Sequence, residues 1–141
     1  MTGSGVFFTI SNMTSSARIR VLIVDDQPHV RKGLQALLDT DNSIEVVGVA
    51  FNGIEAVQLA RSQYPNVILM DASMPHLDGS EAARLIKTSL PGTRIILMQN
   101  DGETISEIDA PVFVARIHKG EPDIDLLAQI NKLFPENEHG L

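Results

Sequence analysis

The chain contains no cysteine among its 141 residues. This absence excludes disulfide bonds, thiolate metal sites and cysteine nucleophiles. We expect a cytoplasmic protein, although a chain without cysteine suits any compartment. Hydrophobic residues make up 43% of the chain. A chain of this size can bury one sizeable core but is too short for two full domains.

Basic residues are scarce as well, with 11 Lys and Arg against 18 Asp and Glu and a formal net charge of −7. Nucleic acids and anionic membranes bind a concentrated basic face, so this balance disfavours both partners. No apolar run approaches the length of a membrane-spanning helix. Residues 1–17 contain neither Lys nor Arg and resemble no signal peptide. We interpret them as a Ser/Thr/Gly-rich tail, and we hypothesise that Phe7, Phe8 and Ile10 pack on the domain or on a second copy.

From Arg18 onward, short apolar runs alternate with segments of helical period. The apolar runs are continuous, which is typical of strands covered on both faces. They lie at residues 21–24, 46–51, 67–70, 95–98 and 112–114 with Ile117. Strands that alternate with helices predict an α/β fold, a doubly wound parallel sheet with helices on both faces.

Five helical segments separate or follow these runs. The first begins near Pro28 and places Val30, Leu34 and Leu38 on one face. Three others show apolar stripes at residues 56–60, 79–89 and 122–134. The segment 103–109 gives only about two turns. We therefore expect the fourth helix in chain order to be short.

Charged residues follow three of the predicted strands. Asp25 and Asp26 follow the first strand, Asp71 ends the third, and Lys119 follows the fifth. The carboxyl ends of parallel strands share one edge of the sheet, where ligands bind. Neighbouring carboxylates repel each other unless a cation joins them, and an all-oxygen ligand set suits Mg²⁺. The pattern predicts a Mg²⁺ site, with Lys119 as a point charge for a phosphoryl group.

Each of these residues also has a simpler interpretation. Asp26 stands where it can cap the first helix, and a single lysine is most often a solvated surface residue. The convergence of all four at one edge favours the functional interpretation. The histidines lack a ligand spacing, so we interpret them as loop or surface residues: His29, His76, His118 and His139.

The chain resembles the receiver domain of bacterial two-component response regulators in three segments. In chain order these are VLIVDD, ILMDASMPHLDG and the lysine that closes the fifth strand. The resemblance spans about residues 18–134 and leaves a tail of residues 1–17 and a stub of residues 135–141, with no room for an effector domain. The MPHLDG segment is most similar to receivers that precede LuxR-type helix-turn-helix domains. The resemblance implies a flavodoxin-like sheet of strand order 2-1-3-4-5.

The resemblance also implies roles for individual residues. Asp71 is the phosphoacceptor, which takes a phosphoryl group from the phosphohistidine of a sensor kinase or phosphotransfer protein. Asp26 and Asp71 bind Mg²⁺ directly, Asp25 binds it through water, and the main-chain carbonyl of Ser73 is a further ligand. Lys119 pairs with the phosphoryl oxygens. Such a chain is a cytoplasmic signalling phosphoprotein and not an enzyme.

Two positions depart from the family pattern. Gln99 stands where receivers carry a Ser or Thr, and Arg116 stands where they carry an aromatic switch residue. Gln99 can donate an N–H from a longer arm, whereas a guanidinium cannot follow a ring into an apolar pocket. Asp101 lies where family side chains influence hydrolysis of the acyl phosphate. We expect the phosphoacceptor to be kept and the conformational relay to be changed.

The leading hypothesis is a single-domain response regulator, phosphorylated on Asp71 with Mg²⁺, that signals through protein contacts and binds no DNA itself. The alternative is an atypical receiver that binds proteins independently of phosphorylation. An aspartyl-phosphate phosphatase needs a second acid where this chain has Ser73, and no flavin loop, P-loop or dinucleotide turn is present. The kinase, the output partner, homodimer formation and the presence of an output domain elsewhere stay open.

Overall fold

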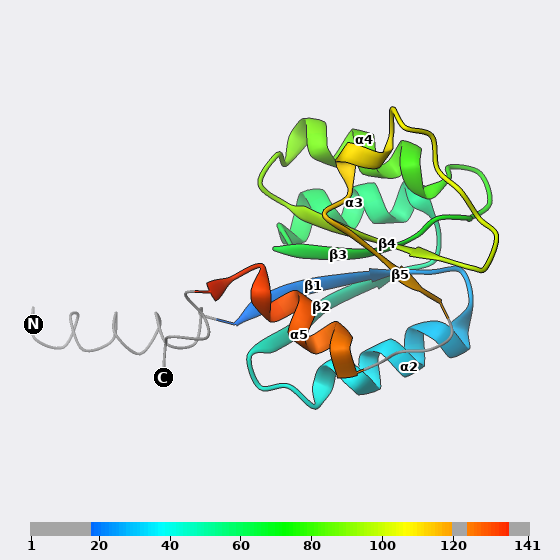
Figure 1. Ribbon diagram of the computed structural model, residues 1–141. Helices are drawn as coiled ribbons and strands as arrows, with labels where there is room; N and C mark the ends of the chain where they lie inside the picture. Colours follow the sequence, from blue (N-terminus) through cyan, green and yellow to red (C-terminus); the bar gives the residue numbers. More distant parts are fainter. Residues whose placement is uncertain (1–17, 120–123, 136–141) are drawn as a thin grey trace, which may run out of the picture.

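Five parallel strands form one sheet in the order β2-β1-β3-β4-β5 in the computed structural model, which describes residues 18–119 and 124–135 (Figure 1). This is the order that the family resemblance implied. The strands are β1 (Ile19–Val24), β2 (Ile44–Ala50), β3 (Val67–Asp71), β4 (Arg94–Gln99) and β5 (Ala115–His118). The hypothesis on Phe7, Phe8 and Ile10 lies outside the described residues, as do His139 and most of the predicted stub.

Two helices cover each face of the sheet. Helices α2 (Pro28–Asp39) and α5 (Ile124–Lys132) lie on one face, and α3 (Gly53–Gln63) and α4 (Gly79–Ser89) lie on the other (Figure 1). Every residue of the central strand β3 is buried, which confirms the interpretation of its continuous apolar run. The edge strands β2 and β5 are partly exposed along their length. Each face therefore has its own apolar core, and the sheet separates them.

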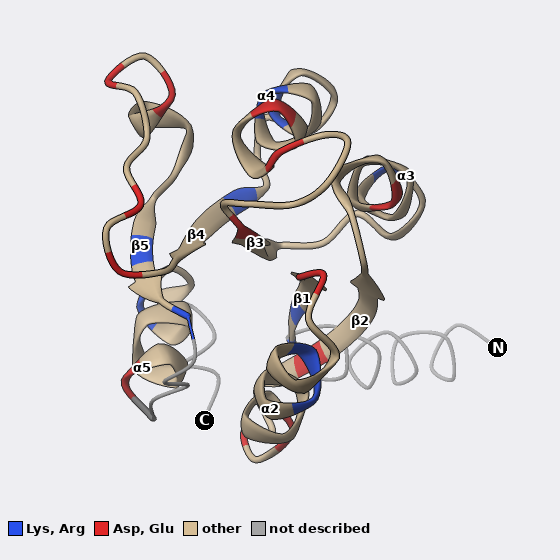
Figure 2. Ribbon diagram, turned by 90° about the vertical axis from the view of Figure 1, so that its right-hand side faces the viewer, with Lys and Arg blue, Asp and Glu red and all other residues tan. Residues whose placement is uncertain are grey.

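The segment between β4 and β5 differs from the prediction, because no helix forms over residues 103–109. A short 3₁₀ turn, η1 (Ala110–Val112), follows instead, and β5 begins at Ala115 rather than at residue 112. The Oγ of Ser106 accepts the N–H of Asp109 and donates to its carboxylate, at 3.2 and 3.1 Å. Such side-chain bonds compete with helical ones. The chain between β4 and β5 runs beyond β5 on the side of the sheet that α4 covers (Figure 2). Its 3₁₀ turn η1 contacts α4.

Among the described residues, every helix is too short or too polar to cross a lipid bilayer.

Candidate functional site

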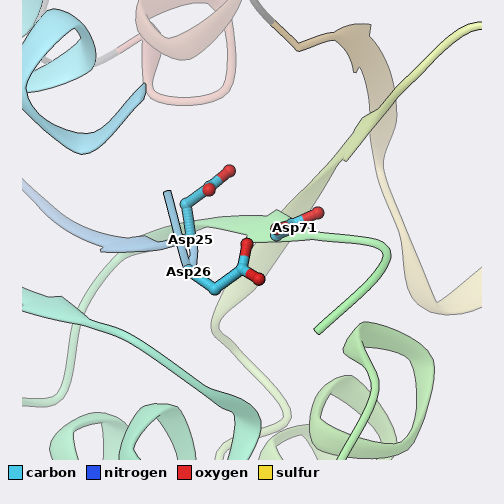
Figure 3. A group of neighbouring side chains, drawn as sticks. All are labelled: Asp25, Asp26 and Asp71. Carbon is cyan, nitrogen blue, oxygen red and sulfur yellow. The ribbon is translucent and has the colours of Figure 1, made fainter. Parts of the chain in front are cut away.

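Three acidic side chains meet at the carboxyl edge of the sheet, as the strand ends predicted. Asp25 and Asp26 follow β1, and Asp71 is the last residue of β3. The two strands are paired neighbours, which brings their ends together. One carboxylate oxygen from each side chain lies within 4.8 Å of the others (Figure 3). Figure 2 looks onto this edge, where the acidic residues after β1 and at the end of β3 are red.

Lys119 lies between two of the acids. Its Nζ is 2.9 Å from Oδ2 of Asp71 and 3.1 Å from Oδ2 of Asp25. The lysine side chain is only 3% exposed and both carboxylates are fully buried. Its main-chain N–H donates to the carbonyl of Gln99 at 2.8 Å, which anchors it beside β4. Lys119 is therefore a buried counter-ion, and its interpretation as a solvated surface lysine is wrong.

The buried group of Asp25, Asp71 and Lys119 contains two acidic side chains but only one basic one. Burial raises the pKa of Asp71 to about 6, and the charge of Asp25 adds to the increase. The ammonium of Lys119 and the N–H of Ser73, which donates to Oδ1 of Asp71 at 3.1 Å, oppose this increase, and the value of about 6 already includes their effect. Burial alone lowers the pKa of Lys119, but its bonds to the two carboxylates raise it overall. The buried site therefore sets two carboxyl groups against a single ammonium.

The turn after β1 uses its two aspartates differently. Oδ1 of Asp25 accepts the N–H of Gln27 at 2.8 Å. Asp26 is exposed and makes no hydrogen bond or ion pair with a described residue. Helix α2 has Gln27 at its N-cap without a capping side-chain bond, so the interpretation of Asp26 as a helix cap is wrong. Its carboxylate remains available to a ligand.

The donor set fits a hard divalent cation. All three side chains supply oxygen, and Oδ2 of Asp25 is buried without a hydrogen bond, with only the ion pair to Lys119. A cation among these oxygens relieves their repulsion and adds a partner for Oδ2 of Asp25, which otherwise pairs only with Lys119. His29, His76 and His118 are exposed, in agreement with their interpretation as loop or surface residues.

A glycine lets α4 approach the end of β3. A Cβ on Gly79 would lie 2.2 Å from the main-chain oxygen of Asp71, so no other residue fits without a shift of the backbone. Asp78 caps the helix, and its carboxylate accepts the N–H of Glu81 at 2.9 Å. Met74 points into the core and anchors the intervening loop. These contacts fix the loop that carries Ser73 beside the acids.

The two departures from the family pattern lie at the ends of β4 and β5. Nε2 of Gln99 donates to the main-chain oxygen of Glu103 at 3.2 Å, and none of its hydrogen bonds reaches Asp71. Arg116 is exposed on β5 and makes no ion pair with a described residue. Asp101 is 94% exposed, and its carboxylate lies 3.2 Å from Nδ1 of His118. The acids and Lys119 thus come together, whereas Gln99 faces the following turn.

Sequence reasoning missed one residue that contacts the site. Nη1 of Arg31 donates to the main-chain oxygen of Asp25 at 2.7 Å, and its guanidinium carbon lies 4.3 Å from the centroid of the Phe51 ring. No sequence motif identifies this arginine, because it binds a main-chain oxygen of Asp25 and because Phe51, whose ring it covers, lies in a different loop.

Comparison with known proteins agrees with the geometry. Residues 21–129 match the response regulator receiver domain. The transcriptional regulatory protein MctR of Rhizobium johnstonii is 40% identical over 86 residues, which cover 61% of this chain and 40% of that protein. The response regulator protein VraR of Staphylococcus aureus is 40% identical over 97 residues, which cover 67% and 46%. The chain therefore spans less than half the length of these relatives.

Solved structures show the same fold. The response regulator domain of Thermotoga maritima CheB superposes with a TM-score of 0.65 and 32% identity, over 86% of this chain and 95% of that one. A two-component response regulator of the LuxR family from Aurantimonas superposes with a TM-score of 0.73 and 25% identity, over 84% and 86%. The family model covers most of the chain, and the sheet order and the acids at its carboxyl edge agree with it. The chain therefore belongs to the response regulator receiver domain family.

Proposed function

We propose that this receiver accepts a phosphoryl group on Asp71 from the phosphohistidine of a sensor kinase or a phosphotransfer protein. The observation that carries the proposal is the buried group of Asp71, Asp25 and Lys119. Because the pKa of Asp71 is about 6, most of this carboxylate is ionised at pH 7 and above. It is then a nucleophile, and its Oδ1 and Oδ2 are oriented by the N–H of Ser73 and by Lys119.

The transfer is a displacement at phosphorus. A carboxylate oxygen of Asp71 forms a bond to the phosphorus while the phosphorus–nitrogen bond to the donor imidazole breaks, and the electrons of that bond stay on the nitrogen. The product is an acyl phosphate on Asp71. Lys119, 2.9 Å from this carboxylate, is placed to pair with the phosphoryl oxygens as their charge comes close.

The residues that would hold Mg²⁺ are Asp26, Asp71 and the main-chain carbonyl of Ser73, with Asp25 acting through water. The cation supplies charge neutralisation and orientation for the phosphoryl oxygens. Asp26 suits direct ligation, because its carboxylate has no described partner to give up. Asp25 suits an outer position, because one oxygen bonds Gln27 and the other pairs with Lys119.

We further propose that the receiver extends over residues 18–134 and that its output is a change in contacts with another protein. A module that has lost phosphorylation has no need for an unbalanced buried group of two carboxylates and a lysine, which costs stability. The group therefore favours a phosphoacceptor over a module that binds independently of phosphorylation. The route from Asp71 to the output differs from the family pattern, since Gln99 holds the turn at Glu103.

Incubation with acetyl phosphate and MgCl₂, followed by intact-mass analysis, tests the proposal. We expect one phosphoryl adduct on the wild type and none on Asp71→Asn or in EDTA. Asp39→Asn is the matched control, because this exposed acid ends α2, lies outside the acidic group, and its loss should leave the adduct in place. Absence of an adduct with acetyl phosphate and with a panel of sensor kinases would overturn the assignment.

A further inference from the structure

Arg31 connects three separate parts of the molecule. It lies in the first turn of α2, and its Nη1 donates to the main-chain oxygen of Asp25 at 2.7 Å. Its guanidinium lies over the ring of Phe51, with 4.3 Å from the guanidinium carbon to the ring centroid. Phe51 follows β2, and its N–H donates to the carboxylate of Glu55 in α3 at 2.7 Å. The arginine thus joins the turn after β1 to the turn after β2.

The atom that Arg31 binds controls the direction of the chain at Asp26. The carbonyl of Asp25 shares one rigid peptide plane with the nitrogen and Cα of Asp26. Fixing this oxygen therefore restrains the rotation that would carry the Asp26 side chain toward or away from Asp71. The carboxylate of Asp26 has no restraint of its own among the described residues.

The position of Phe51 supports a role in holding Arg31. Phe51 is 49% exposed and belongs to neither apolar core, so its packing partner is the arginine rather than the core. A guanidinium over an aromatic face is attracted to it and covers part of it. Phe51 thereby limits the conformations of a long, flexible side chain and leaves its Nη1 directed at Asp25.

We propose that Arg31, held by Phe51, is a positioning residue for the divalent-cation site: it keeps the Asp25–Asp26 turn in the shape that binds the cation. This inference rests on the proposed Mg²⁺ binding. A purely electrostatic effect of Arg31 has the opposite sign, because a positive charge near the acids repels a cation. Removal of the charge alone would tighten Mg²⁺ binding, whereas loss of positioning weakens it.

Calorimetric titration of the full chain with MgCl₂ separates these effects. We expect Arg31→Met to raise the Kd for Mg²⁺ about tenfold, in the range found when an outer partner of a metal ligand is lost. Phe51→Leu, which keeps the charge, should raise it about threefold. In the Arg31→Met background, Phe51→Leu should add nothing further, because the ring acts through the arginine. Lys32→Met is the control: this exposed neighbour on α2 has no described partner, and its loss should not weaken binding.

Hydrogen exchange of residues 25–27 without added metal gives a second measurement. Faster exchange in both Arg31→Met and Phe51→Leu is expected, and unchanged exchange would overturn the inference. Equal or tighter Mg²⁺ binding by Arg31→Met would also overturn it, while the wild-type titration would still support the proposed metal site. A wild type that binds no Mg²⁺ would instead overturn the proposed metal site and the positioning role together.

Discussion

Removal of the charge on Asp71 should stabilise the metal-free protein at neutral pH. The pKa of this buried carboxyl is raised from its ordinary value of 3.8 to about 6. The folded protein therefore holds the proton more tightly than the unfolded chain does. The cost of ionising Asp71 is absent below about pH 4, grows between pH 4 and 6, and is complete above about pH 6.

The size of the effect follows from the same shift. A pKa raised from 3.8 to about 6 corresponds to about 3 kcal/mol of preference for the protonated form, at about 1.4 kcal/mol for each tenfold change. The substitution Asp71→Asn keeps the shape and removes the charge. Local relaxation in the wild type reduces the difference. We expect Asp71→Asn to be about 2 kcal/mol more stable than the wild type at pH 7.5 in EDTA.

Urea unfolding of both proteins at pH 7.5 and pH 4, in EDTA, measures this difference. The gain in the free energy of unfolding should be present at pH 7.5 and nearly absent at pH 4. Asp101→Asn should leave stability unchanged at either pH, because that carboxylate is 94% exposed. MgCl₂ should stabilise the wild type more than Asp71→Asn. An equal gain at both pH values, or no gain at pH 7.5, would refute the reasoning.

Three other substitutions test neighbouring contacts. Lys119→Met leaves two buried carboxylates without their cation, and urea unfolding at pH 7.5 should show a loss of about 3 kcal/mol that shrinks as the pH falls; a pH-independent loss would indicate packing alone. Gly79→Ala forces the backbone away from the end of β3 and should cost about 2 kcal/mol or more, whereas an unchanged melting temperature would contradict the close approach. Gln99→Ser removes the bond to the carbonyl of Glu103, so hydrogen exchange of residues 100–106 should speed up; equal rates would show that the amide does not hold this turn.

The sequence predicts best those elements whose apolar pattern or capping residues are consistent with only one secondary structure. The runs in β1, β3 and β4 are apolar on both faces, and α4 has the predicted limits because Asp78 caps it and Pro91 follows it. The prediction is wrong after β4. The apolar pattern at residues 112–114 suggested a strand, but Val112 belongs to η1 and packs against the core from there. An apolar residue in a short, irregular segment does not reveal which backbone conformation buries it.

Some contacts of the candidate site could also be predicted from the sequence, and others could not. Side chains that end parallel strands share an edge by topology, so the meeting of Asp25, Asp26, Asp71 and Lys119 could be predicted from their order in the chain. The bond from Arg31 to the carbonyl of Asp25 could not. Every residue has a main-chain carbonyl, so an acceptor of this kind leaves no mark in the sequence. The bond from Gln99 to the carbonyl of Glu103 depends on the rotamer of the glutamine, which the sequence does not reveal either.

The charge count at this edge explains why a single lysine is the appropriate number. Three carboxylates and one ammonium carry a formal charge of −2, which one divalent cation balances. A second buried cation would balance half of that charge within the protein and weaken the attraction for Mg²⁺. The absence of any buried cation would leave Asp71 more easily protonated and so a poorer nucleophile, since the Lys119 ammonium already lowers a pKa that burial raises. For the proposed function, one lysine keeps Asp71 ionised near neutral pH and leaves enough negative charge to attract the cation, at the expense of stability in the metal-free protein.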